Sequence, residues 1–177
     1  TFKECEDMAR QALDMALGRG GDKAAVKGPE GFEFYGGVSR SVEKRTKVKS
    51  RIVASAIRDI MNQYDRVLIM GHNNSDMDSV GAAVGKLRFA RICKKPAAIV
   101  IDQETSMSET LLDLLNENGY ADDLLSPREA LPLTGPRTLV VVVDTHVHYL
   151  LESDEVFQSC GGAVVIDHHR RVVGHID

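Results

Sequence analysis

Three short segments of this chain place histidine and aspartate side chains directly after an apolar run. The first follows residues 67–70 and contains His72, Asp76 and Asp78. Imidazole nitrogen together with carboxylate oxygen suits a fairly hard divalent cation better than a cation that prefers thiolate. An aspartate or serine after a strand can also serve only as the cap of the next helix, and Asp78 and Ser79 are candidates for that role. This segment alone therefore leaves a metal site and a helix cap both open.

Two further apolar, β-branched runs end in the same residue types. The run at 138–143 is followed by Asp144, and the run at 163–166 is followed by the Asp-His-His segment at 167–169. Nearly continuous apolar runs between helical segments are typical of parallel strands buried on both faces. Such strands all end at one edge of the sheet, where open α/β sheets bind their ligands. The three segments therefore predict one polynuclear site at that edge.

The remainder of the chain predicts the elements that bring these segments together. From residue 48 onward, helix-like and strand-like patterns of apolar residues alternate. This βαβ repetition, with right-handed crossovers, predicts an α/β fold with a doubly wound, Rossmann-like parallel sheet. Gly81 and Gly85 would weaken the helix after the first strand unless its backbone must approach a sheet or a phosphate closely. We predict strands at 66–70, 97–101, 138–143 and 163–166, helices at about 48–60, 78–93, 107–118 and 149–159, and a loop-rich stretch at 119–136.

The segment before residue 48 predicts a small unit of different character. Apolar residues at three- and four-residue spacing in residues 1–17 indicate an amphipathic helix, and short runs at 22–27 and 32–35 indicate a β-hairpin. A helix and one hairpin are too small to bury a core alone, so we expect this unit to pack against a part of the protein outside this chain. The predicted domains are therefore this unit at 1–47 and the α/β domain at 48–177.

Composition narrows the classes of function. The formal net charge of -4 and the 5% aromatic content do not favour binding of long nucleic acids. No apolar stretch approaches the about 20 residues of a membrane span, so we expect a cytoplasmic domain without membrane contact of its own. The basic segment at 40–51 predicts a solvated linker or helix face, with a phosphate-binding or membrane-surface patch as the alternative. Cys5, Cys93 and Cys160 lack CxxC spacing and are predicted to be buried, reduced thiols.

The order and spacing of the three motifs resemble the DHH phosphoesterase superfamily. That group includes the family II inorganic pyrophosphatases, exonucleases acting on short RNAs, and cyclic-dinucleotide phosphodiesterases. A match of three motifs in order is far more specific than a match of any one of them. The motifs are His72-x-x-x-Asp76-x-Asp78, a strand-terminal Asp144, and Asp167-His168-His169.

This resemblance implies a site for two divalent cations, with Mn²⁺ preferred and other divalent metals possible. His72, Asp76 and Asp144 match the ligands of one metal. Asp78, Asp144 and His168 match the ligands of the second, with Asp144 bridging the two. Two cations about 3.5–4 Å apart can neutralise phosphate oxygens during in-line attack on phosphorus. The implied reaction is direct hydrolysis without a covalent enzyme intermediate.

The resemblance also implies roles beside the metals. Asp144 and His169 are the expected catalytic residues, with His169 reaching the substrate phosphate, where a protonated imidazole would stabilise the transition state. Asp167 is expected to orient its neighbour or the strand end. Arg170 is a candidate for contact with phosphate. His146 is open between a supporting role behind the ligands and an ordinary loop position.

The first part of the chain narrows the resemblance to GdpP-type cyclic-di-AMP phosphodiesterases. Residues 12–22 resemble the end of their degenerate GGDEF domain, and residues 34–51 resemble the connector to their DHH domain. Lys23 and Ala24 stand where the GGDEF signature has Glu-Phe, so no diguanylate cyclase activity is expected. The resemblance implies hydrolysis of cyclic di-AMP to linear pApA within a larger homodimeric protein that is anchored in a membrane through an N-terminal region.

The resemblance covers part of a working enzyme. The family's second metal normally takes one more aspartate downstream of Asp-His-His, and an adenine-binding domain follows further on. We therefore expect this chain by itself to bind the second metal weakly and to turn over little. Two alternatives remain: a short-RNA exonuclease or phosphoadenosine-phosphate phosphatase of the same superfamily, and a nucleotide-binding sensory module whose metal site has lapsed. The intact ligand positions argue against lapse.

Overall fold

The chain divides into two compact units, Thr1–Ile52 and Val53–Asp177. The computed structural model describes residues 2–17, 23–28, 31–36, 42–169 and 174–176. Helix α2 (Val42–Met61) contains both this division and the predicted domain boundary after residue 47. No helix in the described part of the chain is both long enough and apolar enough to cross a membrane.

The first unit is a helix and a hairpin. Helix α1 (Phe2–Leu17) is followed by the antiparallel strands β1 (Lys23–Gly28) and β2 (Gly31–Gly36). Both elements were predicted from the spacing of apolar residues. The buried side chains of α1 are Ala12 and Ala16, four residues apart and therefore on one face of the helix.

The second unit contains one sheet of five parallel strands in the order β5-β4-β3-β6-β7. The predicted α/β fold with a doubly wound parallel sheet is confirmed. One strand was missed, because β5 is only two residues long and lies in the stretch predicted as loop-rich. The strands are β3 (Arg66–Met70), β4 (Ala97–Val100), β5 (Leu124–Leu125), β6 (Thr138–Val143) and β7 (Gly162–Ile166).

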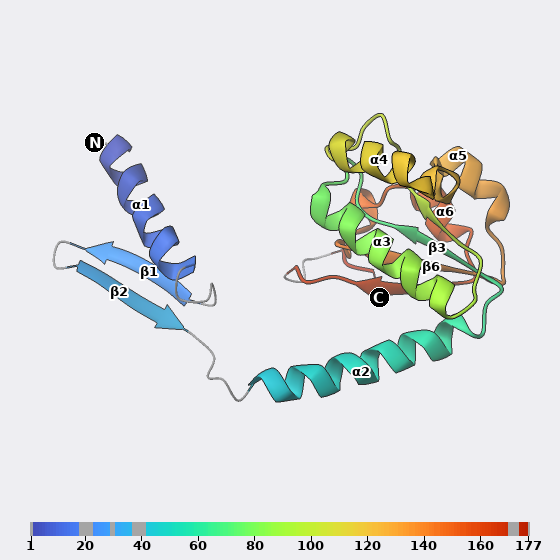
Figure 1. The fold of residues 1–177 in the computed structure, drawn as a ribbon, viewed down its shortest axis with the longest axis horizontal. Helices are drawn as coiled ribbons and strands as arrows, with labels where there is room; N and C mark the ends of the chain where they lie inside the picture. The colour runs from blue at the N-terminus through green and yellow to red at the C-terminus, as the bar shows by residue number, and fades with distance from the viewer. Residues whose placement is uncertain (1, 18–22, 29–30, 37–41, 170–173, 177) are drawn as a thin grey trace. The chain divides into compact units, whose positions relative to one another are not determined.

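Helices cover both faces of this sheet (Figure 1). The end of α2, together with α3 (Met77–Ile92) and α4 (Glu109–Leu115), packs on one face. The short helices α5 (Pro127–Ala130) and α6 (Asp154–Gln158) pack on the other. Successive residues of β3 and β6 alternate between the two cores, as the pleat of a strand requires, so a continuous apolar run serves both.

Two of the predicted helices are shorter than expected. The helix predicted at 107–118 is α4 followed by a π-helical turn, Asn116–Tyr120, which ends the helix with Gly119 at a φ of 81°. The stretch predicted at 149–159 consists of a 3₁₀ turn, His148–Leu150, and the separate helix α6. Ser153 begins α6 by accepting a hydrogen bond from the backbone N–H of Val156, which separates it from the preceding turn.

The strand order places a topological switch between β3 and β6. From β3 the chain adds β4 and then β5 on one side, and it then returns to add β6 and β7 on the other side. Ligands of open α/β sheets bind beyond the carboxyl ends of the strands at such a point. The segments after β3, β6 and β7 therefore meet where a ligand is expected.

One glycine allows helix α3 to start close to the sheet. A Cβ atom on Gly71 would lie 1.9 Å from the Ser79 hydroxyl oxygen and 3.6 Å from the carbonyl oxygen of Val143. Added Cβ atoms on Gly81 and Gly85 would meet nothing within 4 Å. The close approach of α3 to the sheet therefore occurs at Gly71, and no approach to the sheet requires glycine at positions 81 and 85.

Candidate metal centre

The predicted ligands come from the carboxyl ends of three adjacent strands. His72 lies two residues beyond β3, Asp144 follows β6 directly, and Asp167 follows β7 directly. Because β3, β6 and β7 are neighbours in the sheet, their ends bring these side chains to one edge. The central strand carries Asp144, which lies between the other two segments.

Asp144 has an unusual backbone and an unusual environment. Its φ of 59° is in the left-handed region, which few non-glycine residues adopt. Its backbone N–H donates to the carbonyl oxygen of Ile166 at 3.1 Å, so the residue is fixed to the end of β7. The side chain is only 6% exposed. Among the described residues, its buried Oδ1 has no hydrogen-bond partner.

The electrostatic environment of Asp144 disfavours its negative charge. Burial raises the pKa of the Asp144 carboxyl above its ordinary value, and the neighbouring carboxylates of Asp78 and Asp76 raise it further. A buried carboxylate with an unsatisfied oxygen is costly unless a cation compensates it. This combination favours a bound cation at Asp144.

One candidate ligand group consists of His72, Asp76 and Asp144. Their potential ligand atoms all lie within 4.8 Å of one another. His72 Nε2 is 3.8 Å from Asp76 Oδ1 and 3.7 Å from Asp144 Oδ2. These are the three residues predicted to bind the first metal, and the structure brings them together.

Asp76 has a structural role as well. Its Oδ1 accepts hydrogen bonds of 3.0 Å from the backbone N–H groups of Asp78 and Ser79, so Asp76 is the N-cap of α3. The Ser79 bond is the largest influence that lowers the pKa of Asp76, which keeps this carboxylate charged. The suggestion that Asp78 or Ser79 caps the helix is therefore wrong. Capping engages Oδ1, and Oδ2 is not part of these bonds.

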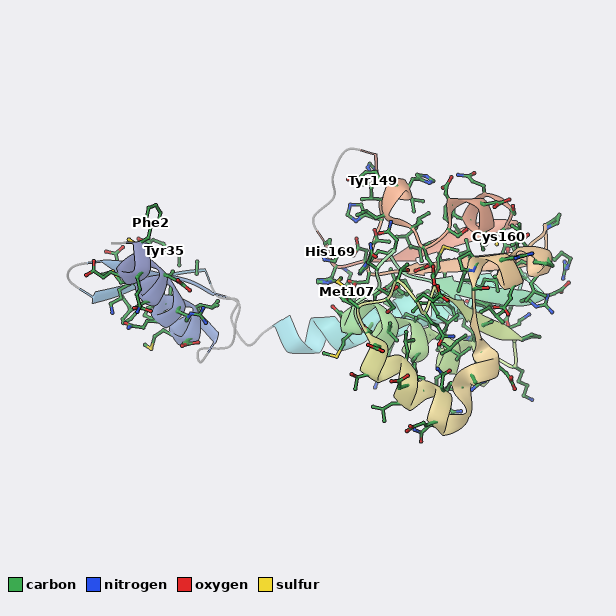
Figure 2. The ribbon with its side chains drawn as sticks, turned by 90° about the horizontal axis from the view of Figure 1, so that it is seen from above. Phe2, Tyr35, Met107, Tyr149, Cys160 and His169 are labelled. Carbon is green, nitrogen blue, oxygen red and sulfur yellow. The ribbon has the colours of Figure 1, made fainter. Side chains whose placement is uncertain are left out.

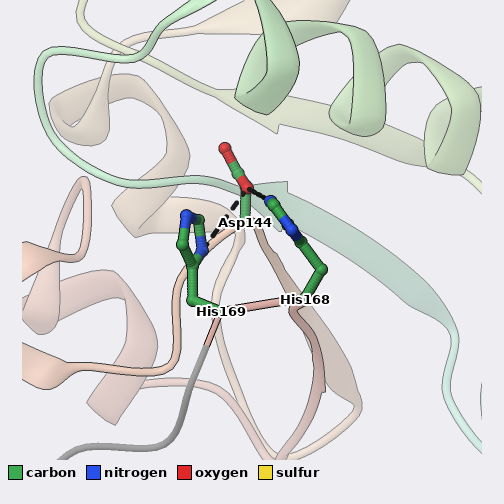
Figure 3. Close-up of side chains that lie close together, drawn as sticks. All are labelled: Asp144, His168 and His169. Carbon is green, nitrogen blue, oxygen red and sulfur yellow. Dashed lines mark ion pairs between the residues drawn. The ribbon is translucent and has the colours of Figure 1, made fainter. Parts of the chain in front are cut away.

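A second group shares Asp144 with the first (Figure 3). Asp144, His168 and His169 also have their potential ligand atoms within 4.8 Å of one another. His168 Nε2 is 3.2 Å from Asp144 Oδ1, as an ionic contact without hydrogen-bond geometry, and 3.5 Å from Asp78 Oδ2. His169 Nδ1 is 3.7 Å from Asp144 Oδ1. The predicted second group was Asp78, Asp144 and His168. The structure places His169 with Asp144 and His168 instead, and Asp78 is outside this group, which it contacts through His168.

Asp167 connects two imidazoles. Its Oδ1 contacts His169 Nδ1 at 2.7 Å and accepts the His169 backbone N–H at 3.1 Å, while its Oδ2 contacts His146 Nδ1. Burial alone would raise the pKa of Asp167, but the hydrogen bonds from His146 and His169 lower it to about 2. The bond from Asp167 is also the main cause that raises the pKa of His169. His146 and Asp167 therefore lie behind His169 and fix its orientation.

A cavity of about 490 Å³ adjoins these groups. Part of its wall is polar and belongs to the predicted site. The other part comes from the segment after β6, where Thr145, Val147, Tyr149 and Leu150 were not predicted to belong to the site. Figure 2 shows Tyr149 of this segment and His169 on the same side of the second unit. The lining residues are His72, Asp76, Asp144, Thr145, His146, Val147, Tyr149, Leu150, Asp167 and His169.

Glu152 was also missed, and it fixes the loop that carries His72. Its Oε1 accepts the backbone N–H of Asp102 at 2.9 Å, and its Oε2 is 3.4 Å from the Ser75 hydroxyl. That hydroxyl also donates to the carbonyl oxygen of His72 at 2.8 Å. Burial raises the pKa of Glu152. No motif marks this residue, because its partners are distant in sequence.

The remaining predictions concern residues apart from this cluster. Arg170 lies outside the described residues. The three cysteines are free; Cys5 is exposed and Cys93 and Cys160 are half-buried, so the prediction of burial is wrong for Cys5 and holds only in part for the other two. Burial raises the pKa of Cys160 to about 11, which makes this thiol a poor nucleophile.

Comparison with known proteins agrees with the fold. Residues 66–176 match the model of the DHH family, N-terminal domain. This chain belongs to the DHH family. An exopolyphosphatase-related protein of Bacteroides fragilis has a similar fold, with a TM-score of 0.54 and 21% sequence identity over 67% of this chain and 35% of that protein.

Among curated proteins, the chain is similar to enzymes named cyclic-di-AMP phosphodiesterase. It is 40% identical over 176 residues to GdpP of Bacillus subtilis strain 168, which covers 97% of this chain and 27% of that relative. It is 38% identical over 170 residues to PdeA of Listeria monocytogenes strain 10403S, which covers 93% of this chain and 26% of that relative. The chain therefore spans about a quarter of the length of these relatives.

Proposed function

We propose that the protein containing this chain hydrolyses a phosphodiester bond in a cyclic dinucleotide, converting cyclic di-AMP to linear pApA. The names and the similarity of the relatives support the substrate. The geometry supports the reaction class through one observation above the others. Two groups of cation-binding side chains share the buried Asp144, whose Oδ1 has no hydrogen-bond partner among the described residues.

The residues present fit a pair of divalent cations. We propose that His72, Asp76 and Asp144 hold one and that Asp78, Asp144 and His168 hold the other. The set offers imidazole nitrogen and carboxylate oxygen without a thiolate, which suits Mn²⁺. Bound cations would neutralise the non-bridging oxygens of the phosphate and supply an activated water. Among the ligands, Asp144 would fix the separation of the two positions, because only it belongs to both groups.

The other side chains have roles in binding and proton placement. Asp167 accepts a hydrogen bond at Nδ1 of His169, and this bond is the main cause that raises the pKa of the imidazole. We propose that the protonated imidazole of His169 binds a phosphate oxygen through its Nε2–H and stabilises negative charge as it develops. His146 secures the other oxygen of Asp167 and limits its rotation. Catalysis by this site therefore requires Asp144 and His169, with Asp167 as a positioning residue.

Properties of the longer protein are part of the same proposal. We propose that residues 1–47 are the remnant of a degenerate GGDEF domain and that residues 48–177 are the first part of the DHH domain. The parent protein would be a homodimer with a cytoplasmic catalytic region and an N-terminal membrane anchor. These proposals depend on the resemblance of residues 12–22 and 34–51 to GdpP-type proteins.

The test is an assay of the longest natural polypeptide that contains this sequence. Cyclic di-AMP, cyclic di-GMP and a short RNA are each supplied with Mn²⁺, and linear products are measured. Preferential cleavage of cyclic di-AMP, lost in Asp144→Asn, supports the proposal. Preference for RNA would favour an exonuclease, and no turnover of any substrate would favour a sensory module. Asp154→Asn is the matched control, because Asp154 is an exposed aspartate paired with His148 outside the cavity.

A further inference from the structure

One wall of the cavity beside the metal-binding groups is apolar. Val147, Tyr149 and Leu150 line the same space as His72 and Asp144. None of the three apolar side chains can serve as a cation ligand of the kind proposed above. Val147 is buried, Leu150 is 37% exposed and Tyr149 is 76% exposed. The exposed ring of Tyr149 at the edge of the cavity is therefore accessible to a ligand.

The backbone behind this wall is fixed on two sides. The carbonyl oxygen of Leu150 accepts the backbone N–H of Asn73 at 2.7 Å, beside His72. Val147 forms a β-bridge with His175 on the other side. The apolar wall is thus attached to the loop that carries His72, so its distance from the ligand groups is set by the backbone. Such a fixed platform can bind a planar group without first becoming ordered.

We propose that Val147, Tyr149 and Leu150 form a subsite for one nucleobase, with the ring of Tyr149 stacking on the base. The inference rests on the proposed function, which brings a nucleotide phosphate to Asp144 and His169. A phosphate held there has its own nucleoside within a few ångströms. The cavity volume of about 490 Å³ is within the range of about 300–1,000 Å³ typical of small-molecule sites. Exposed aromatic rings are the usual stacking platforms for bases.

The chemistry of this wall also predicts its selectivity. Stacking on an aromatic ring accepts every base, because all bases present a flat π face. Thr145 and His146 are the polar neighbours on this segment; the Thr145 hydroxyl accepts the backbone N–H of Val147 at 3.3 Å, and His146 Nδ1 contacts Asp167. The subsite therefore contributes affinity for a purine with little discrimination between adenine and guanine. Preference for one base must come from other parts of the protein.

The experiment measures the contribution of the base to binding separately from that of the sugar phosphate. AMP, GMP and ribose 5-phosphate are titrated into the longest natural polypeptide containing this sequence, with Mn²⁺ present, by isothermal titration calorimetry. We expect AMP to bind at least about fivefold more tightly than ribose 5-phosphate, since stacking on one aromatic ring contributes a factor of this size or more. The part of the affinity that Tyr149 contributes should agree within about threefold between AMP and GMP.

Variants identify the ring that is responsible. Tyr149→Ala should remove most of the advantage of AMP and leave the affinity for ribose 5-phosphate unchanged, while Tyr149→Phe should retain the advantage. Tyr35→Ala, at another exposed tyrosine outside the cavity, is the matched control and should behave like the wild type. Because Tyr149 is largely exposed, its truncation is not expected to impair folding, and circular dichroism checks this.

The outcomes distinguish this inference from the proposed function. If the wild type binds ribose 5-phosphate and AMP equally well, the base subsite is overturned and the phosphate site stands. The same conclusion follows if Tyr149→Ala keeps the full advantage of AMP. If neither ligand binds, the proposed phosphate site fails and the subsite fails with it.

Discussion

The two ends of the sheet carry cavities of similar size but very different chemistry. The cavity at the carboxyl ends measures about 490 Å³, and a second one beside the amino ends of β3 and β6 measures about 560 Å³. At the amino end, Arg137 forms two hydrogen bonds of 2.6 Å to Asp65, and both side chains are more than 60% exposed. At the carboxyl end, Asp144 is buried with an oxygen that lacks a partner among the described residues.

This difference indicates what marks a functional site in this molecule. In the larger cavity Asp65 and Arg137 already pair with each other, so these two charges gain little from a charged ligand. The smaller one is lined by the carboxylates of Asp76, Asp144 and Asp167, and the buried Asp144 has an oxygen without a hydrogen-bond partner among the described residues. A buried carboxylate with an unpartnered oxygen, rather than the size of the cavity, indicates where a ligand binds. The comparison predicts that substitutions at the carboxyl end affect activity and that those at the amino end affect only stability.

The largest expected effect is that of Asp144→Asn. We expect it to lower the turnover of cyclic di-AMP by about 10³-fold or more, because it removes the carboxylate shared by both ligand groups. Asp65→Asn at the amino end should change turnover by less than about twofold, since exposed ion pairs contribute little. Initial rates with Mn²⁺ for both variants provide the measurement.

The same substitution, Asp144→Asn, should lower turnover but raise the stability of the metal-free protein. Since burial raises the pKa of Asp144 in the folded state, its charge opposes folding above the ordinary pKa of 3.8 when no cation is bound. Metal-free Asp144→Asn should therefore melt at a higher temperature than the wild type at pH 7. A lower melting temperature together with unimpaired turnover would contradict the assignment of Asp144 as the shared ligand.

Alanine substitutions of two glycines, one near each end of the sheet, should affect stability and activity differently. A Cβ on Gly161, before β7, would lie 2.0 Å from the carbonyl oxygen of Pro136, and that backbone cannot move without disturbing the chain. Gly161→Ala should therefore lower the free energy of unfolding by about 1–3 kcal/mol or more. Gly71→Ala should cost less, because its nearest neighbour is the Ser79 hydroxyl, but it should displace His72.

Urea unfolding and turnover per folded molecule check both glycine variants. Gly161→Ala should retain the specific activity of its folded fraction, whereas Gly71→Ala should lose activity even when fully folded. Gly81→Ala is the control, since its Cβ would meet no atom within 4 Å. It should stabilise the helix slightly, because alanine is the better helix former. Equal activity of the folded Gly71→Ala protein would show that the close approach is not needed for the site.

The sequence predicted those parts of the molecule that depend on local patterns. Strands β3, β6 and β7 were found because each is an uninterrupted apolar run followed by a polar residue at the same edge. The residue types after these strands were sufficient to predict one common site. Strand β5 was missed because a pair of leucines is too short to show any period.

Other features depend on contacts between distant residues and could not be read from the sequence. Asp76 rather than Asp78 or Ser79 caps α3, and the choice depends on the path of the loop. Gly71 is the glycine that lets α3 approach the sheet, and the packing of α3 on the sheet creates that contact. Tyr149 resembles any surface tyrosine in the sequence, and it becomes notable only beside the cavity. Tertiary packing determines these features, so local patterns do not contain them.

A smaller effect is expected for substitutions of polar side chains that hydrogen-bond to loops at each end of the sheet. Glu152→Gln replaces the oxygen that faces the Ser75 hydroxyl, so we expect turnover and Mn²⁺ affinity to fall by about two- to tenfold, the equivalent of one hydrogen bond. At the amino end, Lys95 donates to the carbonyl oxygen of Tyr64 at 2.7 Å. Lys95→Met should lower stability and leave both quantities unchanged. A Glu152→Gln protein with wild-type metal affinity would exclude a positioning role.

The smallest effect concerns acid stability and compares two carboxylates. The folded-state pKa of Asp167 is lowered to about 2 from its ordinary value of 3.8. A depressed carboxyl pKa contributes stability above pH 3.8 that is lost as the pH falls through about 2. Asp65 also has a lowered pKa, through its hydrogen bond to Arg137, but both partners are exposed to solvent and salt. The free energy of unfolding should therefore decrease less steeply with falling pH in Asp167→Asn than in Asp65→Asn.

Urea unfolding of the metal-free protein between pH 5 and pH 2 measures this difference, at low and at high salt. High salt should weaken the contribution of Asp65, because ions screen exposed pairs, and should leave that of Asp167 nearly unchanged, because its side chain is only 5% exposed. The opposing outcome is that the two variants show the same pH dependence of the free energy of unfolding and the same response to salt. That result would mean that the bonds that Asp167 makes to His146 and His169 are no stronger than a surface ion pair. In that case Asp167 could not hold His169 in one orientation, and the proposed contact of His169 with phosphate would lose its structural basis.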